Sequence, residues 1–308
     1  MFFTIFNQVL VLFFFMGLGY VLAKKGKINN NCTEQMTFLL CYFIMPCVIL
    51  SAFQIDFDPE TFHELLSVGF WTAVLHILMI ASAHLLFTKK TISHPDHRSI
   101  LLFSSIYSNC GFMGFPLLST LIGAQGILYG SAYNAFFSVF LWTHGFLLYA
   151  RRLSLRTLLT SLSNPNIWVA LLGMLLYYYA IHLPAPLLSG IKYMADLNTA
   201  LSMLMIGTTM TKVPFTRLFS EATVWSGVLM RNLIFPLLTV VLLHLCGIKG
   251  ILLLTLSILS CCPSAGVGVL FAALTGKDTV FPGKILSLST ILSLFTMPLI
   301  ISLAESLS

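Results

Sequence analysis

Long apolar runs separated by short polar connections dominate this chain of 308 residues. Asp, Glu, Lys and Arg are absent from residues 1–23, 65–88, 99–150 and 157–191, and the same pattern continues toward the C-terminus. A helix needs about 20 apolar residues to cross the hydrocarbon core of a bilayer. Residues 99–150 are long enough for two crossings, with a turn at 123–126. The pattern predicts an all-α, polytopic membrane protein.

Ten membrane-spanning helices account for these runs. We place them at about 3–23, 34–54, 64–88, 99–121, 127–150, 165–183, 189–211, 220–246, 250–273 and 283–303. The first run is not preceded by basic residues, and Lys24 and Lys25 follow it. We therefore interpret it as a retained helix and not as a signal peptide.

The basic residues predict the orientation. Thirteen of them fall in the odd-numbered connections: Lys24, Lys25, Lys27, Lys89, Lys90, Arg98, Arg151, Arg152, Arg156, Lys212, Arg217, Lys277 and Lys284. The even connections hold only Lys192 and Lys249. Because cytoplasmic loops are rich in Lys and Arg, we expect the odd connections in the cytoplasm and both termini on the non-cytoplasmic side of a bacterial inner membrane.

The composition excludes several classes of protein. Hydrophobic residues make up 58% and charged residues 8%, which is too few polar side chains to cover a soluble globule. The net charge of +6 is divided among short clusters and forms no nucleic-acid surface. The seven cysteines lie mostly within apolar runs without metal-ligand spacing, and no phosphate loop or catalytic cluster occurs. We expect no enzyme activity, metal or cofactor.

The chain contains a weak internal repeat. Residues 98–111 read RSILLFSSIYSNCG, and residues 249–262 read KGILLLTLSILSCC. This pairs the fourth span with the ninth, and predicts two inverted five-helix repeats at 1–154 and 155–308. Inverted repeats are typical of secondary transporters, and interrupted segments at matching positions indicate the binding site.

Helix-breaking residues occur midway through both paired spans. The fourth span contains Asn109-Cys-Gly-Phe-Met-Gly-Phe-Pro116, and the ninth contains Ser260-Cys-Cys-Pro-Ser-Ala-Gly-Val-Gly268. We expect both segments to unwind near the middle of the membrane, where freed N–H groups and half-helix N-termini would suit an anion. A simple proline kink in each helix is the alternative.

Arg231 is the one charged side chain that we place well inside a span. Burying it costs a few kcal/mol on insertion scales. It is interpreted either as the partner of an anionic substrate or as a switch between states. The alternative is that Arg231 reaches the cytoplasmic interface along its own aliphatic stem.

These motifs resemble the auxin efflux carrier family. Asn109–Pro116 is similar to the Asn-x-Gly-Phe-x-Gly-x-Pro signature of that family, and 262–265 is similar to its second crossover motif. Residues 231–236 also fit, and the span count, polarity and order agree over the whole chain. One departure is Asn198-Thr-Ala-Leu201, where family members often carry a proline.

The resemblance implies a fold similar to bile acid:sodium symporters, with crossed broken helices four and nine. It also implies secondary transport of organic anions, since plant relatives export indole-3-acetate and bacterial relatives include malate permeases. The short connection after residue 150 resembles the compact microbial type. The expected partners are a small organic anion and the lipid bilayer, with a homodimer as an option and no nucleic acid.

The proposed mechanism is alternating access, with a carboxylate bound where the two breaks meet. The substrate-binding residues that we expect are Asn109, Gly111, Gly114, Pro116, Asn134, Arg231, Ser260, Pro263 and Ser264. Asn109 would donate its side-chain amide, and Gly111, Gly114, Pro116 and Pro263 would act as hinges.

The coupling ion is left open by the sequence. No Asp or Glu falls in the middle of a predicted span, which argues against a paired-aspartate antiporter. His76, His84, His144 and His244 are candidate proton acceptors, and a uniporter also fits. The alternatives are a sodium-coupled bile-acid-like carrier, a channel and a membrane sensor. A channel would need a polar path, and no span carries a clear polar stripe. A sensor would need an output domain, and no connection is long enough to hold one.

Overall fold

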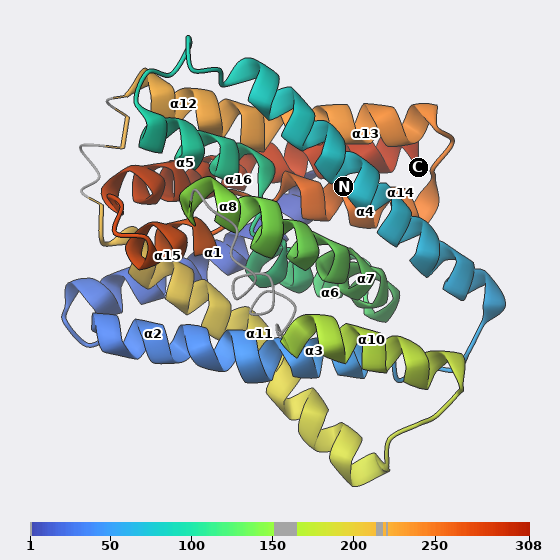
Figure 1. Cartoon of the computed structure of the whole chain (residues 1–308). Helices are drawn as coiled ribbons and strands as arrows, with labels where there is room; N and C mark the ends of the chain where they lie inside the picture. The colour runs from blue at the N-terminus through green and yellow to red at the C-terminus, as the bar shows by residue number, and fades with distance from the viewer. Residues whose placement is uncertain (1, 151–164, 214–217, 220) are drawn as a thin grey trace.

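The computed structural model describes residues 2–150, 165–213, 218–219 and 221–308, and its regular elements there are all helical (Figure 1). The helices are α1 (Phe2–Lys24), α2 (Asn30–Leu39), α3 (Met45–Ala52), α4 (Pro59–Leu86), α5 (Pro95–Ile106), α6 (Phe115–Leu121), α7 (Ala124–Phe140), α8 (Phe146–Ala150), α10 (Pro165–Tyr178), α11 (Ala185–Met210), α12 (Ala222–Leu229), α13 (Phe235–Leu245), α14 (Gly250–Cys261), α15 (Val267–Leu274) and α16 (Val280–Leu307). The all-α prediction is confirmed.

Each of the ten predicted spans is occupied by helix, either continuous or interrupted. Five helical segments in the described ranges are long and apolar enough to cross a membrane: Phe2–Lys24, Asn30–Ala52, Pro59–Leu86, Ala222–Leu245 and Val280–Leu307. α11 is a single unbroken helix, so the missing proline near Asn198 leaves it continuous. Arg151, Arg152, Arg156, Arg217 and the predicted boundary between repeats lie outside the described residues.

Side-chain caps and a glycine with a positive φ define several helix ends. Asn29 accepts a hydrogen bond from the Cys32 amide at 2.9 Å and caps α2. Asp58 caps α4 by accepting from the Thr61 amide at 2.8 Å. Its hydrogen bonds from the Thr61 side chain and backbone hold the pKa of this carboxyl below its ordinary value. α6 ends at Leu121, two residues before Gly123, whose φ of 84° suits glycine.

Three of the π-helical turns in the described ranges end two residues before a proline. The turns Leu40–Ile44, Cys110–Gly114 and Met230–Ile234 precede Pro46, Pro116 and Pro236. In each case the residue before the proline donates its amide to the carbonyl five residues back. Proline has no N–H and clashes with the carbonyl four residues back, and the wider turn accommodates it without breaking the helix.

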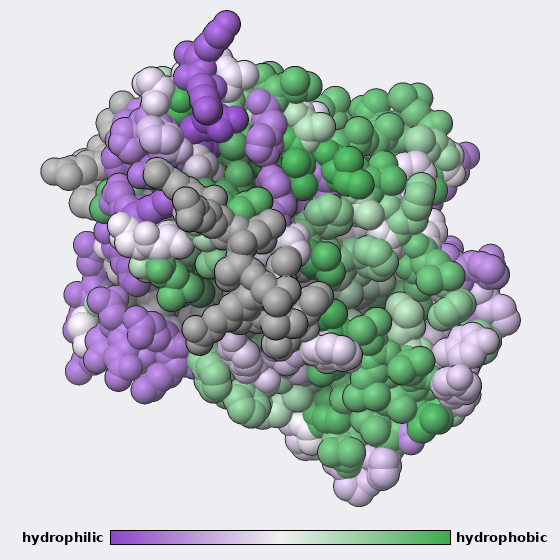
Figure 2. All heavy atoms as spheres, in the orientation of Figure 1, coloured by the Kyte–Doolittle hydropathy of each residue, from purple (hydrophilic) through white to green (hydrophobic). Residues whose placement is uncertain are grey.

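The connections alternate between two ends of the molecule. Those after α1, α4 and α15 lie at the left in Figure 1, and those after α3, α10 and α13 lie at the right. Figure 2 shows most hydrophilic residues gathered toward the left end, a smaller group at the right edge, and a largely apolar surface between them. Apolar side chains such as Phe14, Phe70 and Trp168 are exposed, as expected where lipid is the solvent.

α1 packs closely along α11 because both helices carry glycine at the contact. A Cβ atom on Gly19 would lie 2.2 Å from the Leu204 carbonyl oxygen, and one on Gly207 would lie 1.9 Å from the Met16 carbonyl oxygen. Small residues allow two membrane helices to approach to backbone contact. These two helices therefore form a tight pair beside the broken helices.

Candidate functional site

Two helices are interrupted near the centre of the molecule. α5 ends at Ile106, and helical structure resumes at Cys110. α14 ends at Cys261, and α15 begins at Val267. The first break lies before most of the predicted Asn109–Pro116 segment, because Gly111 and Gly114 are held in the π turn and Pro116 is tolerated in the first turn of α6.

The two interrupted segments meet through their backbones. The Asn109 amide donates to the Pro263 carbonyl at 2.7 Å, and the Ala265 amide donates to the Tyr107 carbonyl at 2.9 Å. These bonds form an antiparallel bridge between Ser108 and Ser264. Four of the backbone groups that the breaks release are thus paired with each other, which satisfies them where lipid could not. We call residues 107–109 and 262–266 the crossing.

Arg231 lies against the crossing, with 1% of its surface exposed. Its Nη1 donates to the Ile106 carbonyl at 2.7 Å and to the Ser105 carbonyl at 3.3 Å. These carbonyls are at the C-terminal end of α5, which carries partial negative charge. The interpretation that Arg231 reaches the interface is wrong, because carbonyls freed by the break of α5 hold its guanidinium inside. Nε and Nη2 have no hydrogen-bond partner among the described residues.

A second polar connection reaches the other segment. Asn232 donates from Nδ2 to the Ser289 carbonyl at 2.8 Å and accepts at Oδ1 from the Ser289 hydroxyl at 2.5 Å. The same hydroxyl accepts from the Ser264 amide at 2.9 Å. Asn232 and Ser289 were not among the predicted site residues. The signal was the run of hydroxyl residues at 287–293, which lie buried on α16.

The predicted glycines permit close contacts near the crossing. A Cβ atom on Gly114 would lie 2.5 Å from Leu259 Cδ2, so this glycine lets the π turn approach α14. A Cβ atom on Gly111 would lie 2.9 Å from the Met45 methyl carbon and 4.0 Å from Asn134 Oδ1. Asn109 and Asn134 are both buried. Glycine, asparagine and the crossing therefore occupy one region.

Some predicted binding groups have protein partners in this structure. The Ser260 hydroxyl donates to the Ser257 carbonyl of its own helix at 3.0 Å. The Ser264 and Ala265 amides, which we expected to face an anion, donate to Ser289 and Tyr107. Binding roles for Ser260, Pro263 and Ser264 stay predictions.

Three of the four candidate histidines hydrogen-bond to a backbone carbonyl. His76, His84 and His244 place Nδ1 at 2.7–3.1 Å from the carbonyls of Thr72, Ile80 and Leu307. His144 instead places Nδ1 2.9 Å from the Tyr107 hydroxyl, which connects it to the crossing. No group of three His, Cys, Asp or Glu side chains in the described part of the chain could hold a metal ion.

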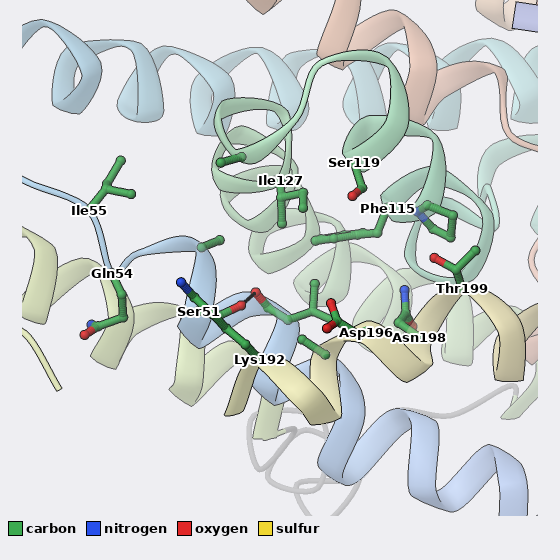
Figure 3. Close-up of a pocket in the computed structure, with 15 residues that line it drawn as sticks. Ser51, Gln54, Ile55, Phe115, Ser119, Ile127, Lys192, Asp196, Asn198 and Thr199 are labelled. Carbon is green, nitrogen blue, oxygen red and sulfur yellow. Dashed lines mark hydrogen bonds between the residues drawn. The ribbon is translucent and has the colours of Figure 1, made fainter. Parts of the chain in front are cut away.

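A cavity of about 380 Å³ lies between α3, α6, α7 and α11 (Figure 3). Its inner wall includes Phe115 and Pro116, which directly follow the π turn of the first broken segment. Asn198 of α11 is buried there, and its Oδ1 has no hydrogen-bond partner among the described residues. Lys192 and Asp196 are exposed side chains of the lining. Gln54 and Ile55 place the cavity toward the end of the even connections.

Ion pairs join neighbouring segments at the end of the molecule opposite the cavity. Lys277, after α15, lies 3.0 Å from the Asp96 carboxylate in the first turn of α5. Lys284 of α16 forms an ion pair with Glu221, just before α12. The first pair joins the outer ends of the two broken segments.

Known proteins identify the family. A family model described as "Membrane transport protein" matches residues 4–154 and 149–301. A curated relative from Methanothermobacter thermautotrophicus, described as an uncharacterized transporter, is 21% identical over 285 residues and covers 92% of each chain. With the apolar helices, these findings indicate a multi-pass integral membrane protein. The chain therefore belongs to the auxin efflux carrier-like family of membrane transport proteins.

Proposed function

We propose that the protein is a secondary active transporter that moves a small organic anion, such as a carboxylate or an indole acid, by alternating access. The observation that carries this proposal is the crossing of two interrupted helices beside the buried Arg231 guanidinium. Unwound backbone at the centre of a transporter is typical of a substrate site. A buried cation without a carboxylate partner among the described residues favours an anionic ligand.

The proposed architecture is two inverted five-helix repeats, 1–154 and 155–308, in a bacterial inner membrane. One break lies in each half, and the alternation of connections supports an even number of crossings. The odd connections would face the cytoplasm, because the basic residues gather there. Both termini would then lie on the non-cytoplasmic side.

The cavity supplies the proposed access route. It reaches Pro116 from the end of the even connections, while the Asp96–Lys277 pair joins the broken segments at the other end. The helix Cys110–Leu121 starts at the crossing, so its N-terminal end would attract a carboxylate. Asn109 and Asn134 would donate amide hydrogen bonds, and Gly111 would allow the ligand to approach the backbone.

Uptake into reconstituted vesicles tests the proposal. The probes are radiolabelled L-malate and indole-3-acetate, measured both as net uptake and as counterflow, with empty vesicles as the blank. Wild-type protein should show saturable counterflow of at least one probe. Asn109→Ala should lower its kcat/KM about tenfold or more, because a hydrogen bond to a charged group is worth about 1.5–3 kcal/mol.

The matched control is Asn30→Ala, which removes the same amide from an exposed position at the start of α2. It should transport like wild type. Equal uptake by Asn109→Ala and wild type would remove Asn109 from the site. Absence of saturable counterflow with both probes would reject the proposed function for these two substrate classes.

A further inference from the structure

The π turn Met230–Ile234 presents two consecutive polar side chains to the crossing. Arg231 and Asn232 are each only 1% exposed. Consecutive residues of a helix point in directions about 100° apart, so two neighbouring side chains can bond to different elements. Arg231 bonds to the end of α5, and Asn232 bonds to Ser289 of α16.

The two side chains hold different strands of the crossing. Arg231 fixes the carbonyl of Ile106, the residue directly before Tyr107 of the bridge. Asn232 orients the Ser289 hydroxyl, which accepts from the Ser264 amide in the other strand. One turn of one helix is thereby linked to both interrupted segments, to the first directly through Arg231 and to the second through Ser289.

The arginine also changes the local electrostatics. The last carbonyls of α5 carry partial negative charge and lie beside the place where an anion would bind. Nη1 donates to two of them, at Ser105 and Ile106, and its positive charge offsets that field. This effect requires no contact between Arg231 and the substrate.

We propose that Arg231 and Asn232, with Ser289, are positioning residues that keep the two strands of the crossing in register, so that its anion site persists through the transport cycle. This inference rests on the proposed function, because it concerns the same site. It assigns Arg231 a role through the α5 carbonyls rather than as a substrate ligand.

The experiment combines thiol protection with transport. Cys110, Cys261 and Cys262 are fully buried at the crossing, whereas Cys246 is exposed and serves as an internal reference. Purified wild type, Arg231→Lys, Arg231→Met and Ser289→Ala are treated with N-ethylmaleimide, and mass spectrometry of peptides measures the labelling rate at each cysteine. Ser293→Ala is the matched control, since among the described residues this buried α16 hydroxyl bonds only within its own helix, to the Thr290 carbonyl.

We expect labelling of Cys110 or Cys262 to become at least tenfold faster in Arg231→Met and Ser289→Ala, with Arg231→Lys between these and wild type. Ser293→Ala should stay protected. With L-malate or indole-3-acetate as the probe, Ser289→Ala should raise KM, and its combination with Arg231→Lys should depart from additivity, because both act on one bridge.

Unchanged thiol protection in Arg231→Met and Ser289→Ala would overturn the inference, as would identical behaviour of Ser289→Ala and Ser293→Ala. If Arg231→Met does not fold, Arg231→Lys and Ser289→Ala decide the same question. The labelling requires no substrate, so loosened thiols in a protein that transports neither probe would separate a failed proposed function from a failed positioning role.

Discussion

His97 stacks its ring on Phe281, with the centroids 3.9 Å apart and the planes inclined by 5°. It lies in the first turn of α5, outside the membrane-spanning part of that helix, and contacts the first turn of α16. Burial, and then the neighbouring His94, lower the pKa of His97 below its ordinary value of 6.5. Its neutral form is therefore favoured in the folded protein.

This shift predicts a loss of stability in acid. As pH falls below about 6.5, the unfolded chain takes up the proton first, because the folded pKa is the lower one. Between pH 7.5 and 5.5 the melting temperature of wild type should fall by about 2 °C more than that of His97→Gln. His63→Gln, at an exposed position of α4, should follow wild type. Equal slopes for His97→Gln and wild type would contradict the assignment.

At the residue scale, the sequence indicates which residues are unusual more reliably than it indicates which groups those residues contact. Arg231 is recognisable because a charge inside an apolar run is rare, but its carbonyl partners become available only once α5 breaks at a distant position. The amide of Ser264, a predicted ligand-binding residue, donates in this structure to Ser289, 25 residues away in the chain. Such pairings depend on tertiary packing, which local patterns do not contain.

Helix breaks are more predictable, because glycine and proline act locally. The two predicted interruptions occur within a few residues of the proline-containing motifs. The first break includes Asn109 and lies before the rest of the Asn109–Pro116 segment, because the π turn accommodates the proline. Buried hydroxyls on α14 and α16 do not stand out in the sequence as a polar stripe, because Ser and Thr occur in apolar helices, where they bond to their own backbone, as Thr290 does.

The α1–α11 pair gives a sharp test at the element scale. Gly19→Ala would place a methyl group where the Leu204 backbone lies, whereas Gly17 on the same helix has no neighbouring atom within 4 Å of its would-be Cβ. Gly19→Ala should lower stability by about 1–3 kcal/mol, as overpacking does. Gly17→Ala should leave stability unchanged. Thermal unfolding in detergent compares the two, and similar melting temperatures would show that the helices separate at little cost.

The two ends of the molecule differ: one has a cavity, and at the other an ion pair joins the broken segments. The cavity lies toward the even connections, and the Asp96–Lys277 pair spans the two broken segments at the odd ones. If the protein works by the proposed alternating access, the two ends open in turn, and this pair must separate before the second end opens.

Breaking this pair should make that end open more often. A partly exposed ion pair is worth up to about 1 kcal/mol, equal to an approximately fivefold change in an opening equilibrium. In Asp96→Asn, hydrogen exchange of residues 94–102 and 275–283 should be about fivefold faster than in wild type. The reversed pair, Asp96→Lys with Lys277→Asp, should restore most of the protection. Unaltered exchange in Asp96→Asn would show that other contacts hold this end closed.

The backbone pairing at the crossing also affects which amino-acid substitutions such a carrier can tolerate. Its two strands are joined by main-chain amides and carbonyls, which every amino acid except proline supplies in full. Side chains at Ser108 and Ser264 can therefore be exchanged without removing the pairing itself. New ligand preferences could thus arise by substitution around a scaffold that keeps its shape.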